Sequence, residues 1–191
     1  MADDITEWLV RLQEGDAAAL DRVTRLLYDE LRQIASRRLR FERSHHTLGT
    51  TALVHEAFLR LARQNGLPAE SRTQFLAAAS NTMRRVLVDY ARARRRLKRG
   101  DGVVPLQLDE ADAFLTEAAA DEILALEEAL ERLALAEPRA ARVVEQRFFS
   151  GLTIEEIAKH LGLSEKTIRR DWILARAWLR REVARALELP E

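Results

Sequence analysis

Four polar side chains suited to DNA binding lie close together near the end of the chain: Lys166, Thr167, Arg169 and Arg170. Arginine and lysine can donate hydrogen bonds to guanine edges or pair with phosphates, and a threonine hydroxyl can bond to either. Their spacing places them in the first turns of one helix, the end that a recognition helix presents to the major groove. The pattern predicts binding to duplex DNA. An ordinary helical hairpin with a solvated basic face is the alternative.

A second and more strongly basic segment covers residues 84–99, where eight Lys or Arg side chains accompany the single acid Asp89. Val86, Leu87 and Tyr90 would give a helix here one buried face. Such a helix follows phosphates, with an affinity that falls as the salt concentration rises. RNA, an acidic membrane surface or plain solvent would suit the same face. The basic residues are Arg84, Arg85, Arg92, Arg94, Arg95, Arg96, Lys98 and Arg99.

Two short helices joined by a turn are needed to present the first of these clusters. Thr153 and Glu156 stand three residues apart, which is the spacing of a capping box at the start of a helix. Gly162 can adopt the left-handed backbone of a turn, and Ser164 can cap the next helix. Trp172 is expected to pack in the core behind that helix, with a DNA contact as the alternative. These signals predict a helix-turn-helix.

The rest of the chain has apolar residues at helical spacing and lacks the alternation typical of strands. Proline and glycine fall between the helical stretches, where they end one helix and precede the next. The predicted fold is all-α, with two small helical domains joined by an acidic linker, the C-terminal domain being a helix-turn-helix. Helices of the first domain are expected over about 4–14, 17–41, from Thr50 onward, and 75–99. Asp16 is expected to cap the second of these helices, and Ser71 with Gln74 has the spacing of a capping box before the last.

Charge is distributed unevenly along the chain, although its net value is zero. Residues 1–100 carry a balance of +7, residues 101–135 a balance of −9 and residues 136–191 a balance of +2. Basic ends around an acidic middle suggest two binding modules and a connecting segment with a different task. The predicted domains are 1–99 and 121–191, with 100–120 as the acidic linker.

Several classes of function lack their characteristic residues in this sequence. There is no cysteine, which excludes disulfides and thiol catalysis. The four histidines do not have the spacing of a metal site, and there is no glycine-rich phosphate loop or nucleophile motif. No apolar stretch is long enough for a signal peptide or a membrane span. We therefore expect a cytoplasmic binding protein that has no catalytic activity, cofactor, metal or membrane partner.

In their order along the chain, these motifs resemble those of extracytoplasmic-function sigma factors. The segments LQEGDAAALDRV and LVHEAFLRL resemble the opening helices and the polymerase-docking helix of that family. FLAAASNTMRRVLVDYARARRR resembles its promoter-melting helix, and LTIEEIAKHLGLSEKTIRRDWILARAWL resembles its minus-thirty-five reader. The resemblance implies that the chain directs core RNA polymerase to promoter DNA and assists melting. A stand-alone helix-turn-helix repressor is the alternative.

The resemblance also implies roles for individual residues. The helix that docks on the polymerase would contribute Leu53, Val54, Glu56, Phe58 and Leu59. Contacts to the minus-ten element, including a flipped base, would come from Asn65, Ser71, Asn81, Arg84, Arg85, Arg92, Arg95 and Arg96. Contacts to the minus-thirty-five element would come from Lys166, Thr167, Arg169 and Arg170.

One departure from the family pattern concerns regulation. Many members begin the docking helix with Asp-Ala-Glu-Asp, whereas this chain has Gly49-Thr50-Thr51-Ala52. A phosphothreonine carries about −1.5 to −2 charge, comparable to the missing carboxylates, and a helix N-terminus favours phosphate. We therefore expect a Ser/Thr protein kinase to activate the factor at Thr51, with Thr50 and then Thr47 as alternatives. An anti-sigma factor is the other regulator considered, and Thr50 would then only cap the helix.

Overall fold

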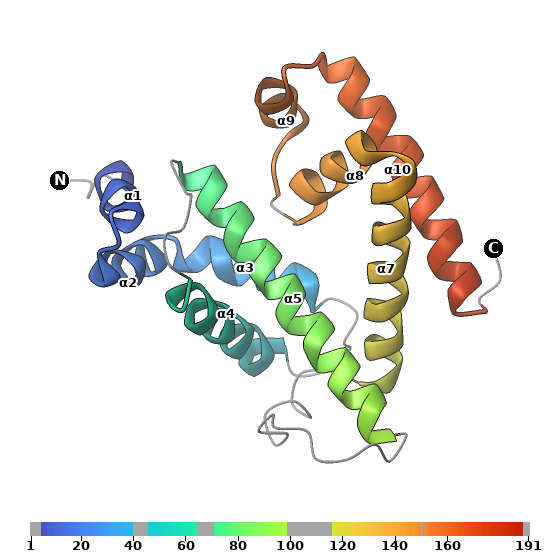
Figure 1. Ribbon diagram of the computed structural model, residues 1–191, viewed down its shortest axis with the longest axis horizontal. Helices are drawn as coiled ribbons and strands as arrows, with labels where there is room; N and C mark the ends of the chain where they lie inside the picture. Colours follow the sequence, from blue (N-terminus) through green and yellow to red (C-terminus); the bar gives the residue numbers. More distant parts are fainter. Residues whose placement is uncertain (1–4, 40–45, 65–70, 99–115, 150, 189–191) are drawn as a thin grey trace. The chain divides into compact units, whose positions relative to one another are not determined.

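The computed structural model describes residues 5–39, 46–64, 71–98, 116–149 and 151–188. These residues form helices and turns, and none of them lies in a strand, so the predicted all-α fold is confirmed (Figure 1). The chain divides into two compact units, Met1–Val86 and Leu87–Glu191. The boundary falls inside the long helix α5, Arg72–Lys98, which therefore contributes to both units.

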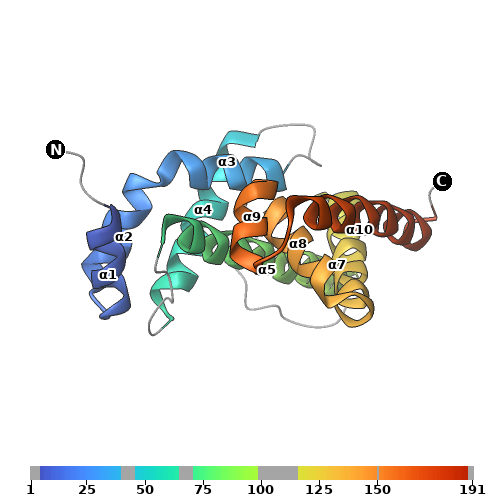
Figure 2. The ribbon, with the colours of Figure 1, turned by 90° about the horizontal axis from the view of Figure 1, so that it is seen from above.

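The first unit contains α1 (Ile5–Gln13), α2 (Ala17–Leu26), α3 (Tyr28–Arg38), α4 (His46–Ala62) and the first part of α5. Helix α1 packs against α2, and α3 packs against α4 (Figure 2). As predicted, Asp16 caps α2, because its carboxylate accepts a hydrogen bond from the Ala18 N–H at 2.9 Å.

The single helix predicted over 17–41 was wrong, because the structure has two helices there. The break is at Leu27, where φ is −106° and ψ is 15°. The Leu27 side chain is buried, its N–H donates to the Val23 carbonyl, and its own carbonyl accepts from the Leu31 N–H. The chain thus bends at a buried apolar anchor while the backbone groups of that residue keep their partners.

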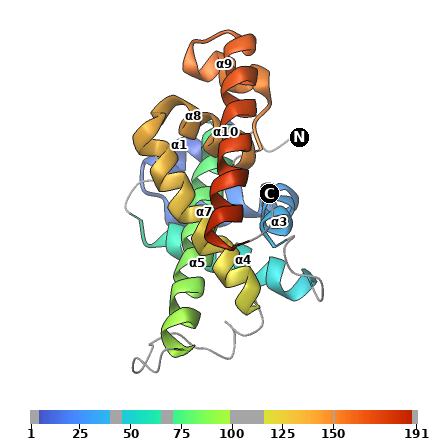
Figure 3. The same cartoon turned by 90° about the vertical axis from the view of Figure 1, so that its right-hand side faces the viewer.

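The second unit contains α7 (Glu117–Ala136), α8 (Pro138–Val144), the π-helical turn η1 (Glu145–Phe149), α9 (Ile154–Leu161) and α10 (Glu165–Ala186). Helices α7 and α10 run alongside each other, and α8 packs on both (Figures 1 and 3). Their shared core consists of Ala129, Leu130, Leu133, Ala140, Ala141, Val144, Ala175 and Leu179.

A second hydrophobic cluster in this unit supports α9. It consists of Val143, Ile157, Ala158 and Ile168, which come from α8, α9 and α10. Trp172 packs against both this cluster and the core of α7, α8 and α10. As the sequence predicts, Trp172 packs against the core, although it remains half-buried, and it contacts both clusters.

The predicted acidic linker, 100–120, is only partly described by the structure. Its last residues are already helical, because α7 begins at Glu117. Thr116 caps that helix by accepting a hydrogen bond from the Ala119 N–H at 3.2 Å. Residues 100–115 lie outside the described residues.

Candidate nucleic-acid and polymerase interface

The start of α9 and the turn between α9 and α10 are fixed by the caps that the sequence predicts. The Thr153 hydroxyl accepts from the Glu156 N–H at 3.1 Å, and the Glu156 carboxylate accepts from the Thr153 N–H at 2.8 Å. Gly162 has a φ of 65°, in the left-handed region. The Ser164 hydroxyl accepts from the Thr167 N–H at 3.2 Å. The predicted capping box, turn glycine and second cap are confirmed, and together they hold the N-terminus of α10 in place.

The first turns of α10 carry an exposed basic face. Lys166, Arg169 and Arg170 are exposed, as a DNA-contacting role requires. Arg169 lies 3.1 Å from the carboxylate of Glu165, but exposed ion pairs of this kind contribute little to stability. Arg169 can therefore exchange that carboxylate for a phosphate or a base. Thr167 differs, because it is half-buried and its hydroxyl lies 2.9 Å from the hydroxyl of the capping serine.

Two apolar residues of α10 were missed by reasoning from the sequence. Ile173 and Leu174 are 62% and 61% exposed. They follow Arg169 and Arg170 by one helical turn, and so they extend the same exposed side of the helix. Apolar side chains on a recognition helix can contact thymine methyl groups. Their three- and four-residue spacing from the arginines was the signal that could have identified them.

Helix α5 exposes most of the arginines assigned to the minus-ten element. Its apolar side chains are buried, including Phe75, Met83 and Val86. Two of the polar candidates on this helix, Asn81 and Arg84, are half-buried. The other four are exposed: Arg85, Arg92, Arg95 and Arg96.

The start of α5 is held by a cap and an ion pair. Ser71, a minus-ten candidate, accepts a hydrogen bond from the Gln74 N–H at 3.2 Å, as the sequence predicts. Arg72 lies 2.7 Å from Glu30 of α3, and the hydrogen bond it donates holds the pKa of Glu30 below its usual value. A DNA contact by Ser71 would have to share the hydroxyl with this cap. Asn65 lies outside the described residues.

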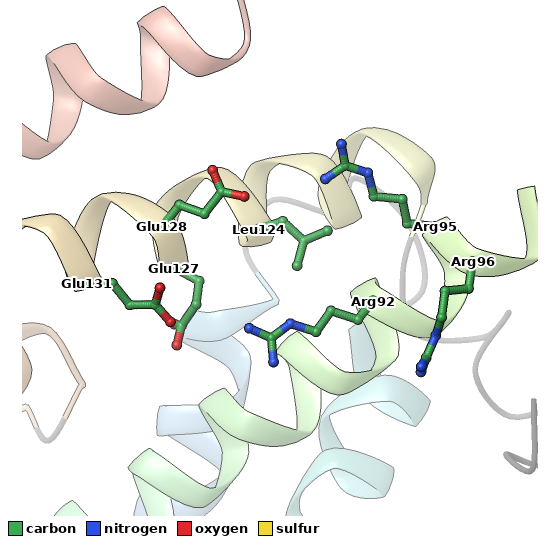
Figure 4. A pocket seen from close by; sticks show the side chains of 7 residues that line it. All are labelled: Arg92, Arg95, Arg96, Leu124, Glu127, Glu128 and Glu131. Carbon is green, nitrogen blue, oxygen red and sulfur yellow. The ribbon is translucent and has the colours of Figure 1, made fainter. Parts of the chain in front are cut away.

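Three of the α5 arginines line a pocket that also contains carboxylates of α7, within the second compact unit. Arg92, Arg95 and Arg96 line a pocket together with Leu124, Glu127, Glu128 and Glu131 of α7. Figure 4 shows the Arg92 guanidinium pointing toward Glu127 and Glu131, whereas Arg96 points away from them. Phosphates that reach these arginines must therefore compete with nearby negative charge.

The five polymerase-docking candidates on α4 do not share one environment. Leu53 and Val54 are buried, so they hold the helix in its unit and have no surface to offer a partner. Glu56 and Phe58 are half-buried, and Glu56 lies 3.1 Å from Arg60. Leu59 is exposed.

The exposed side of α4 includes residues that the sequence did not single out for docking. Thr51, His55 and Leu59 are all exposed and lie four residues apart, so they form one stripe along the helix. From the sequence, His55 was considered only as a possible metal ligand. The spacing of metal ligands does not indicate which side of a helix is exposed. These three side chains are therefore accessible along one side of α4.

The expectation that α4 begins near Thr50 was wrong, because it begins at His46. Thr50 is therefore inside the helix, where it cannot be the N-cap, and it is 4% exposed. Thr51, the next residue along the helix, is exposed. The side chain of Thr47 lies outside the described residues. Of Thr50 and Thr51, whose side chains the structure describes, Thr51 is the exposed one.

Comparison with known proteins identifies one family. The family described as ECF sigma factor matches residues 2–185 of the chain. No curated protein and no solved structure matches the chain. In the described ranges, no group of three or more His, Asp or Glu side chains is arranged to hold a metal ion. No helix there is both long enough and apolar enough to cross a bilayer.

Proposed function

Because the chain belongs to the ECF sigma factor family and so serves RNA polymerase in transcription initiation, we propose that its basic helices divide the promoter between them. Helix α10 reads the minus-thirty-five element, and α5 binds the minus-ten element and helps to melt it. This places the factor in the cytoplasm with core polymerase and gives it no catalytic role of its own.

The exposed start of α10 is the observation that carries this proposal. Lys166, Arg169 and Arg170 are all exposed on a helix whose N-terminus is fixed by a capped turn. A side chain that reads base edges must be both accessible and held in register. Ile173 and Leu174 add apolar contacts to thymine methyl groups on the same side.

The face of α5 supports the second half of the proposal. Its exposed arginines share one helix with a well-buried apolar side, so their positions are set by packing. Cations held in this way bind phosphates with strong salt dependence. Asn81 and Arg84, which are half-buried, are assigned to the melted strand beside them.

Transcription with purified components tests the assignment. The chain alone is expected to bind promoter duplex weakly, and core polymerase with the chain is expected to start at specific promoters. Polymerase alone, and polymerase with an Arg169→Ala/Arg170→Ala variant, serve as controls. Tight and sequence-specific duplex binding by a dimer without polymerase would instead support the repressor reading.

Docking of α4 on the polymerase forms the third part of the proposal, with phosphorylation of Thr51 as its switch. A phosphate there would lie on the stripe that contains His55 and Leu59. The helix dipole stabilises a phosphate on Thr51 less than the sequence suggested, since Thr51 is beyond the first turn of α4. The added negative charge itself remains, and basic side chains on the partner would attract it.

Phosphorylation of Thr51 is expected to tighten binding to core polymerase by about tenfold, because it supplies charge-assisted hydrogen bonds. The measurement is the Kd for core polymerase of phosphorylated and unmodified protein. Thr51→Ala should behave as the unmodified chain does, even after kinase treatment, while Thr24→Ala on α2 serves as the matched control. Equal Kd values for the phosphorylated and unmodified forms would rule out this switch and leave an anti-sigma factor as the regulator.

A further inference from the structure

Asp171 is an unusual residue to find on a helix that meets DNA. It directly follows Arg169 and Arg170, whose side chains are 64% and 66% exposed, yet the Asp171 side chain is only 6% exposed. A carboxylate taken out of water must be paired and hydrogen-bonded, because otherwise its desolvation is strongly unfavourable. Asp171 can therefore stay buried only if another group pairs with its carboxylate.

That partner is Arg139, near the start of α8. The Arg139 Nε donates to one carboxylate oxygen of Asp171 at 2.6 Å, and a terminal nitrogen donates to the other at 3.1 Å. This two-point geometry is the strong form of the arginine–carboxylate pair. The hydrogen bond to Asp171 also raises the pKa of Arg139. The pair joins α8 to α10 at the residue that directly follows the exposed arginines.

A second guanidinium lies at the edge of the same carboxylate. The Arg170 Nε is 3.8 Å from Asp171 Oδ1, which is too long for a hydrogen bond but within ion-pair range. While Arg139 occupies the carboxylate, Arg170 has little to gain by moving closer. Without Arg139, the carboxylate would be left with Arg170 as the neighbouring cation among the described residues.

We propose that Arg139 is a positioning residue for promoter reading: it occupies Asp171 and so leaves Arg170 directed at DNA. This inference rests on the proposed function of α10. Loss of Arg139 makes Asp171 draw in Arg170, and one arginine is removed from the reading face. The helix itself stays in place, because Trp172 packs against both hydrophobic clusters and the Arg147 guanidinium lies 5.1 Å from its ring.

The test uses core polymerase with the full chain on a promoter whose minus-thirty-five base pairs are substituted one at a time. Arg139→Gln is expected to lose about tenfold discrimination at the base pair that Arg170→Ala also ceases to distinguish. Discrimination at the base pair read by Arg169 should be kept.

Two further variants separate positioning from general stability. Arg139→Gln/Asp171→Asn should restore discrimination, since an amide pair has no charge with which to attract Arg170. Arg139→Lys should also remain close to the wild type, since it keeps a cation beside Asp171. Equal loss at every base pair, a lowered melting temperature without rescue by the double variant, or unchanged discrimination in Arg139→Gln would each overturn the proposal. Failure of the wild-type protein to distinguish any minus-thirty-five base pair would instead reject the proposed function of α10.

Discussion

Trp172→Ala is expected to lower the free energy of unfolding of the second unit by about 3 kcal/mol, at the lower end of values for large aromatic residues because the ring is only partly buried. The loss is large for one residue since Trp172 packs against both hydrophobic clusters and under the Arg147 guanidinium. Removing the ring would separate the turn that holds α9 from the core of α7, α8 and α10. Urea unfolding followed by circular dichroism measures the change.

Trp178→Ala is the matched control, because Trp178 packs against one of the two clusters. It should destabilise the unit less than Trp172→Ala does. Trp172→Phe should retain most of the stability, since an aromatic ring remains between the clusters. If Trp172→Ala unfolded like the wild type but failed to use the minus-thirty-five element, the ring would belong to the DNA interface.

Neutralising three arginines of α5 is expected to have the largest effect on promoter binding. Arg92→Gln/Arg95→Gln/Arg96→Gln removes exposed cations from one end of the helix. If each contacts one phosphate, the slope of log affinity against log salt should fall by about 2.7 on duplex DNA, and by about 2.1 on a single strand. Promoter-complex formation by the holoenzyme, measured over a series of salt concentrations, gives this slope.

The carboxylates across the pocket provide a control of opposite charge. Glu127→Gln/Glu131→Gln changes the same surroundings without removing a cation. That variant should bind promoters at least as well as the wild type, because phosphates would meet less competing charge. If the arginine variant left the slope of log affinity against log salt unchanged, the three arginines would be solvated surface residues that contact no phosphate.

The caps and the turn around α9 and the start of α10 were predictable because their signals are local. The capping box depends on two residues three positions apart, and Gly162 and Ser164 each act on their immediate neighbours. Sequence spacing decides such geometry almost without help from the rest of the fold. The same reasoning correctly predicted the caps made by Asp16 and Ser71.

The errors came from features that tertiary packing decides. The bend at Leu27 has no glycine or proline and depends on burial of an apolar side chain. The early start of α4 includes Gly49, which the sequence-based prediction placed before the helix although a helix tolerates one glycine. The pairing of Arg139 with Asp171 joins residues that are 32 positions apart, and no local pattern indicates it.

The location of the tryptophans gives each compact unit its own optical signal. Trp8 lies on α1 with the Arg11 guanidinium 4.9 Å from its ring, and the other two tryptophans, Trp172 and Trp178, lie on α10. A Trp8→Phe chain therefore has tryptophan emission only from the second unit, and a chain with both α10 tryptophans changed to phenylalanine has it only from the first. The order in which the two units melt, and the moment at which either one meets the polymerase, can then be followed from intrinsic fluorescence without attaching a dye.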